Sequence, residues 1–133
     1  MTLLKNIGAV VLGLVVGNLL NFALLQVNLQ IFPLPEGVDL SDTEALGAAI
    51  REMPGAAWIL VFAAHLGQAL VGGWIAARLG ASHHRLLALI VGGLSMLAGI
   101  ANAMSLGLPL WAWIEMPLYL VAAYLGGRAA RCP

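Results

Sequence analysis

The stretch AAWILVFAAHLGQALVGGWIAARL, residues 56–79, carries no charged residue before Arg78. A helix that crosses a membrane needs about 20 consecutive, mostly apolar residues, and this stretch supplies them. Three other segments meet the same requirement, the last of them shorter and separated from the third by a tight GLPL turn. The sequence therefore predicts an all-α fold, a four-transmembrane-helix bundle with helices over residues 3–27, 56–79, 86–108 and 109–126.

The composition supports a membrane protein with a single domain over residues 1–133. Hydrophobic residues make up 62% of the chain and charged residues 9%, against roughly 25% charged in soluble domains. The expected partner is the lipid bilayer, and the lack of a basic cluster argues against nucleic acid.

A single cysteine, Cys132, excludes a disulfide within the chain and any C-x-x-C site, so no cofactor is expected. The first segment contains Asn18 and Asn21 and lacks a cleavage site, so we expect a retained helix.

The charges predict the orientation of the helices. The loop over residues 28–55 holds five acidic residues and one arginine, Arg51, which leaves it with a net charge of −4. The other five basic residues flank the N-terminus, the second loop and the C-terminus. Basic segments stay in the cytoplasm, so both termini are expected inside and the acidic loop outside. These five residues are Lys5, Arg78, Arg85, Arg128 and Arg131.

The acidic loop has an expected helix of its own. FPLPEGVDL (32–40) predicts an extended segment, because proline disfavours helix. SDTEALGAAIREM (41–53) predicts a short amphipathic helix, with Ser41 and Glu44 at capping-box spacing and an apolar stripe from Leu46 to Met53. Two positions remain open for this helix: across the outer mouth of the bundle, or resting on the lipid headgroups.

Polar residues from all four expected helices fall in one layer in the outer half of the membrane. Counting from the outer surface places them about six to nine residues deep, at about 1.5 Å per residue. Polar groups in hydrocarbon need partners, so we expect Glu115 to lie within contact or one-water reach of His65 or Asn102. The full layer is Asn18, Asn21, His65, Asn102 and Glu115, with Gln68 and Tyr119 on the same helix faces as His65 and Glu115.

Two interpretations of this layer remain open. It is either structural, with hydrogen bonds between helices that fix their packing, or a site for a proton, a cation or a small polar ligand. No metal site is expected, since the adjacent His83 and His84 fit a solvated loop. Trp58, Trp111 and Trp113 fall at the outer helix ends, where indole rings favour the membrane interface.

Small residues predict close contacts between helices. Gly13 and Gly17 form a G-x-x-x-G pair, and Gly72, Gly92 and Gly99 mark further close approaches. Such residues let helix backbones touch, either within the chain or between copies of it.

Five stretches resemble a group of small bacterial four-helix membrane proteins that are usually left uncharacterised. The resemblance covers most of the chain. It implies a four-span bundle of this length in a bacterial inner membrane and brings no activity. The matching stretches are GLVVGNLLN (13–21), PLPEGVDLSD (33–42), AAHLGQALVGGWIAAR (63–78), AGIANAM (98–104) and WAWIEMPLYL (111–120).

Three functions follow as hypotheses. The first is a small inner-membrane protein that acts by association, as an accessory subunit or a homo-oligomer. The second is an oligomeric transporter or channel for an ion or polar solute that uses Glu115 and His65. The third is an intramembrane enzyme with the same two residues as acid and base. It ranks last, because the sequence offers no recognisable nucleophile or metal triad.

Overall fold

The computed structural model describes residues 1–131, and these form helices with no strand among them. The predicted all-α fold is confirmed. Three helices, α1, α3 and α4, are long and apolar enough to cross a membrane, which is consistent with a membrane protein. The elements are α1 (Thr2–Ile31), α2 (Thr43–Arg51), α3 (Gly55–Leu79), α4 (His84–Leu106), the 3₁₀ helix η1 (Leu110–Ile114) and α5 (Glu115–Ala129).

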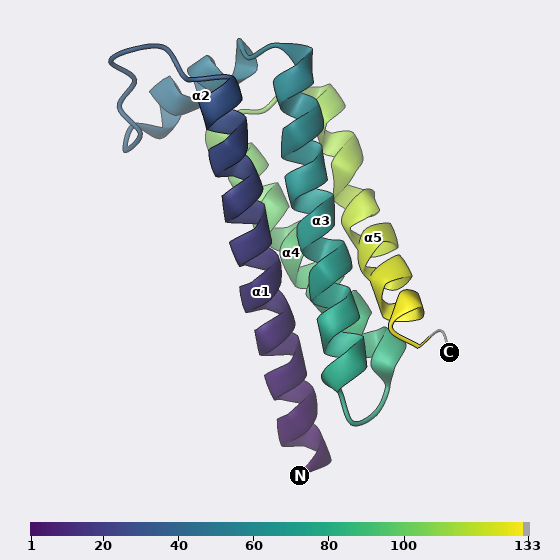
Figure 1. Ribbon diagram of the computed structural model, residues 1–133. Helices are drawn as coiled ribbons and strands as arrows, with labels where there is room; N and C mark the ends of the chain where they lie inside the picture. The colour runs from purple at the N-terminus through teal and green to yellow at the C-terminus, as the bar shows by residue number, and fades with distance from the viewer. Residues whose placement is uncertain (132–133) are drawn as a thin grey trace.

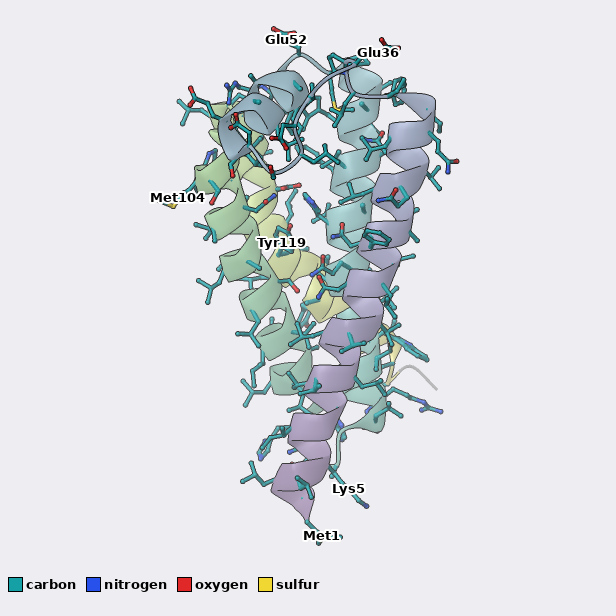
Figure 2. The ribbon with its side chains drawn as sticks, turned by 90° about the vertical axis from the view of Figure 1, so that its left-hand side faces the viewer. Met1, Lys5, Glu36, Glu52, Met104 and Tyr119 are labelled. Carbon is teal, nitrogen blue, oxygen red and sulfur yellow. The ribbon has the colours of Figure 1, made fainter. Side chains whose placement is uncertain are left out.

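The long helices run alternately up and down, with α3 packed against α1, α4 and α5. Figure 1 shows the N-terminus and the end of α5 at one end of the bundle and α2 at the other. Charged residues separate in the same way: Lys5 lies at one end, and Glu36 and Glu52 lie at the other (Figure 2). The N-terminus and the end of α5 thus share one end of the molecule, and the acidic loop occupies the opposite end.

Two helix ends differ from the sequence expectation, and each has a local cause. α1 continues to Ile31 rather than residue 27, because nothing interrupts it before Pro33, which disfavours helix at Phe32. α4 ends at Leu106 rather than residue 108. There Gly107 takes a left-handed conformation with φ of +60°, and the N–H of Leu108 bonds the carbonyl of Ala103.

The fourth long element begins as a 3₁₀ helix and becomes an α-helix at Glu115. Pro117 has no N–H to donate to Trp113, four residues earlier, so a regular α-helix cannot extend through this point without losing a bond. The 3₁₀ geometry of η1 lies at this point of the chain. α5 also runs to Ala129, three residues past the expected end.

Glycines bring α1 and α3 into backbone contact. A Cβ added at Gly13 would lie 2.5 Å from the carbonyl oxygen of Gly72, and one at Gly17 would lie 2.6 Å from that of Gln68. Gly92 does the same for α4 and α5, where a Cβ would meet Ala123 at 2.6 Å. These small residues therefore pack within the chain, which decides one alternative left open by the sequence.

The short helix α2 is fastened to the outer end of α4. A guanidinium nitrogen of Arg51 donates to the carbonyls of Leu106 and Gly107, at 2.8 and 2.9 Å. This satisfies acceptors that a helix end leaves unpaired. The cap of α2 is Asp42, which accepts from the N–H groups of Glu44 and Ala45, so the expected capping role of Ser41 is wrong.

Ser41 instead orders the turn before α2. Its hydroxyl and its N–H both donate to Asp39, and these bonds hold the pKa of that carboxyl below its usual value. The turn and the Arg51 contacts together place α2 across the end of the bundle that lies opposite the N-terminus.

Candidate functional site

Glu115 and His65 form a buried pair between α5 and α3. The Nδ1 atom of His65 lies 3.0 Å from Oε1 of Glu115, within hydrogen-bond distance. The Glu115 side chain is 3% exposed and that of His65 is 14% exposed. The contact expected between these residues from their common depth is confirmed.

The Glu115 carboxyl group lies where η1 passes into α5. Glu115 is the first residue of α5 and follows η1 without a break, so its own N–H bonds the carbonyls of Ala112 and Trp113. The second carboxylate oxygen, Oε2, is buried and has no hydrogen-bond partner among residues 1–131. The carboxyl group can therefore accept one more donor.

The ring of Tyr119 packs against the face of the His65 imidazole. Its ring stacks on that of His65 with centroids 6.1 Å apart and planes inclined by 24°. Tyr119 is itself buried, and Gly99 on α4 makes room for it, since a Cβ there would lie 3.0 Å from the tyrosine hydroxyl. Figure 2 shows Tyr119 in the middle of the bundle. Three helices thus fix the orientation of the His65 ring.

His65 lies on the wall of a cavity of about 310 Å³ at the end of the molecule that carries α2, here called the outer cavity. Its walls come from α1, α3 and α4, and it is covered by Leu46 and Ile50 of α2 and by Met53, just after α2. Most of the lining is aliphatic. The polar side chains in the lining are Asn28, His65 and Asn102.

Asn28 was missed in the sequence, where it was assigned to the outer loop. It is 2% exposed, lines the outer cavity, and its Oδ1 has no hydrogen-bond partner in the described part of the chain. A buried polar group without a partner is rare and calls for an explanation. The sequence did contain a signal for this position. Asn28 comes seven residues after Asn21, so a first helix extended past residue 27 would place both on one helix face.

The other members of the expected polar layer do not join the pair. Asn102 is exposed and lines the same cavity as His65, but no hydrogen bond links it to Glu115. Gln68 lies one turn deeper and donates to Ser95 on α4 at 3.3 Å. The layer is therefore divided, and only His65, Glu115 and Tyr119 form a contiguous group.

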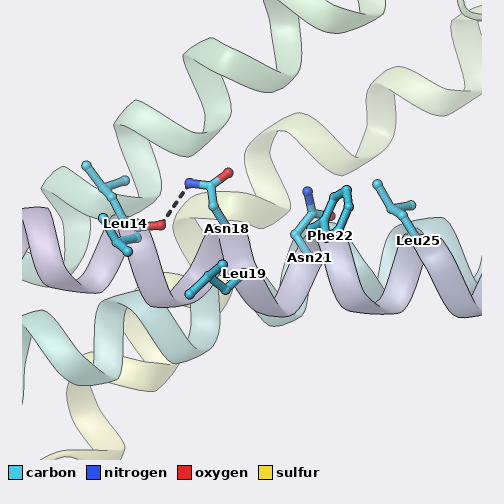
Figure 3. Close-up of a pocket in the computed structure, with 7 residues that line it drawn as sticks. Leu14, Asn18, Leu19, Asn21, Phe22 and Leu25 are labelled. Atoms are coloured by element: carbon cyan, nitrogen blue, oxygen red, sulfur yellow. Dashed lines mark hydrogen bonds between the residues drawn. The ribbon is translucent and has the colours of Figure 1, made fainter. Parts of the chain in front are cut away.

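Asn18 and Asn21 lie on a different surface. They line a shallow groove built only from α1 residues, where Asn18 donates to the carbonyl of Leu14 at 2.8 Å. Figure 3 shows both asparagines on the same side of α1, with Phe22 and Leu25 beyond them. The Oδ1 atom of Asn21 is buried without a partner. Neither asparagine has a hydrogen bond to Glu115 among residues 1–131, so the two lie apart from the pair although they belong to the expected layer.

Aromatic rings gather beside the outer cavity. Trp58 is buried and lines the cavity, and its ring meets that of Trp111 edge-on at 4.7 Å. The ring centroid of Phe62 lies 6.3 Å from that of Trp58. Trp111 is 53% exposed, as expected for a ring at a membrane interface. Trp58 is instead buried within the chain, so the interface role expected for it is wrong, whereas Trp113 is half-buried against the core and its interface role stays a prediction.

At the opposite end, polar contacts close the loop between α3 and α4. Asn6 accepts from the N–H groups of Ala81 and Ser82 and donates to the Ser82 hydroxyl. Arg131 contacts His84.

Over residues 1–131, no group of three or more His, Cys, Asp or Glu side chains could hold a metal ion. Cys132 lies outside the described residues.

Comparisons with protein-family models, with curated proteins and with solved structures find no match for this chain. The resemblance to small four-helix membrane proteins therefore remains an expectation, and the function must be argued from the site.

Proposed function

We propose that the protein is a small polytopic membrane protein that binds an ion or a small polar solute at the His65–Glu115 pair, as a transporter or a receptor-like binding protein. The observation that carries this proposal is the buried pair at the wall of the outer cavity. An ionisable residue within a membrane is expensive to keep and marks functional sites by default.

The geometry suits acid–base or ion-binding chemistry. With Nδ1–H donated to the Glu115 carboxylate, the other ring nitrogen of His65, Nε2, presents a lone pair. Glu115 holds the imidazole in this tautomer, and stacking on Tyr119 fixes its plane. The pair is thus a proton acceptor whose orientation is set before any ligand arrives.

Association of copies is the second candidate, and it no longer draws support from the glycines, which pack within the chain. It draws support from Asn18 and Asn21 on the open groove of α1. A carboxamide both donates and accepts, so asparagines on two copies can pair with each other across a helix interface. The partner in this version is a second copy of the chain.

Native mass spectrometry of protein extracted gently from membranes tests both candidates at once. We expect a discrete bound small molecule or ion on the wild-type protein, lost in Glu115→Gln and His65→Phe, whose folds survive. Gln30→Leu is the control, because Gln30 is an exposed amide on α1 that does not line the outer cavity. It should retain the bound species.

A homo-oligomer without any bound species, dispersed by Asn21→Leu, would support association and contradict the binding proposal. Loss of the bound species in Gln30→Leu as well would show that the site is not specific to the pair.

We further propose that η1 and α5 together form a fourth membrane span. α5 contributes roughly 22 Å at 1.5 Å per residue, and η1 adds roughly 10 Å at 2.0 Å per residue. The sum matches the hydrocarbon core of about 30 Å. Both termini would then lie on one side, which the basic residues assign to the cytoplasm of an inner membrane.

Cysteine labelling checks this topology. In a Cys132→Ser background, Glu36→Cys should react with an impermeant maleimide added outside intact cells, and Ala81→Cys should react only after lysis. Both positions are exposed, so folding does not hide them. Labelling of Ala81→Cys in intact cells would reverse the orientation.

A further inference from the structure

We infer that the outer cavity selects a small lipophilic amine, a ligand with an apolar body and one protonated amino group. This rests on the proposed function of the His65–Glu115 pair and names the chemical class of its ligand.

Two atoms at the site can accept a hydrogen bond and have no partner among residues 1–131. Asn28 Oδ1 is buried in the cavity lining, and His65 donates from Nδ1 to Glu115, which leaves Nε2 as an acceptor. The Glu115 carboxylate holds the imidazole and does not itself line the cavity. An ammonium group has three N–H donors and no acceptor, so it complements such a set.

The charges around the cavity disfavour an anion. The loop that covers it carries a net charge of −4, and its one cation, Arg51, is engaged with the carbonyls at the end of α4. No lysine or arginine lines the cavity. A carboxylate or phosphate ligand would meet acceptors in the lining and the negative charge of the covering loop, whereas both favour an ammonium ion.

The remaining walls fit the apolar part of such a ligand. Leu46 and Ile50 of α2, Met53 just after it and Val61 of α3 give an apolar surface. Trp58 adds an aromatic ring to the lining, which favours a cation near its face and an apolar ring near its edge. The cavity of about 310 Å³ lies at the lower end of the range of small-molecule sites, so the ligand is compact.

Three compounds of one shape separate the possibilities: benzylamine, benzyl alcohol and benzoate. Binding is measured by isothermal titration and by saturation-transfer NMR, with the protein in nanodiscs of neutral phosphatidylcholine and empty nanodiscs as the blank. At pH 7.5 we expect benzylamine to bind at least tenfold more tightly than benzyl alcohol, and benzoate not to bind.

Asn28→Leu separates ligand recognition from folding. It removes the buried acceptor, so benzylamine should bind at least tenfold more weakly, while the thermal stability stays equal or rises because an unsatisfied polar group has gone. The matched control is Gln30→Leu, an exposed amide at the same end of α1. Its affinity for benzylamine should equal that of the wild type.

The outcomes also distinguish this inference from the proposed function. Equal binding of the amine and the alcohol, or binding of benzoate, would overturn the choice of ligand class and leave a His65-dependent site in place. Absence of binding by all three compounds would overturn the inference, while the proposed function is judged separately by the species found on the native protein. Unchanged amine affinity in Asn28→Leu would also overturn it.

Discussion

Gly13→Leu and Gly17→Leu should each destabilise the fold by about 3 kcal/mol, at the upper end of the cost of overpacking. The atoms that a new side chain meets are the backbone carbonyls of Gly72 and Gln68, at 2.5 and 2.6 Å from the added Cβ. A side chain could rotate away, but a helix backbone cannot, so α1 and α3 must separate. The free energy of unfolding, measured by titration of folded protein with sodium dodecyl sulfate, gives the effect.

Gly8→Leu is the matched control for this prediction. Gly8 lies on the same helix, and a Cβ there has no atom within 4 Å. Its stability should stay within about 0.5 kcal/mol of the wild type, as for most surface substitutions. Equal losses in Gly8→Leu and Gly13→Leu would show that α1 does not pack on α3 through this face.

Glu115→Leu should destabilise the fold by about 3–5 kcal/mol if His65 is left charged, and by about 1–3 kcal/mol if it is neutral. The reason is that His65 Nδ1, buried beside it at 3.0 Å, loses its partner. Glu115→Gln should cost little, because an amide oxygen accepts from Nδ1–H in the same place. Unfolding titrations of the two variants measure the difference.

A double-mutant cycle identifies the pair as the cause. His65→Phe combined with Glu115→Leu should be more stable than Glu115→Leu alone, because both buried polar partners are then replaced by apolar groups. Strictly additive losses in the double variant would mean that the two residues do not interact.

The sequence was sufficient to predict the long helices and the contact between His65 and Glu115. Runs of about 20 apolar residues located α1, α3 and α4, and the alternating helix directions placed His65 and Glu115 at one depth. Depth along a helix follows from counting residues at a fixed rise. Predicting the contact required only one further assumption, that two polar groups at equal depth both face the inside of the helix bundle.

Rotation of each helix about its axis was harder to predict. Asn18 and Asn21 have the same depth as the pair, but both line the groove on α1 rather than the space between α3 and α5. The outer cavity was equally out of reach, because it depends on the docking of α2 through Arg51 onto carbonyls more than fifty residues away in the chain. Such contacts arise from tertiary packing and leave no periodic signal.

The most direct test of the account is the distance between His65 and Glu115 in the protein embedded in lipid bilayers. Solid-state NMR with ¹³C in the Glu115 carboxyl and ¹⁵N in the His65 ring reports it through dipolar dephasing. A carboxylate oxygen 3.0 Å from Nδ1 requires strong dephasing of the carboxyl carbon by Nδ1, with the proton on that nitrogen. Absence of dephasing, with the Glu115 carboxyl remote from the imidazole, would contradict both the site and the function proposed for it.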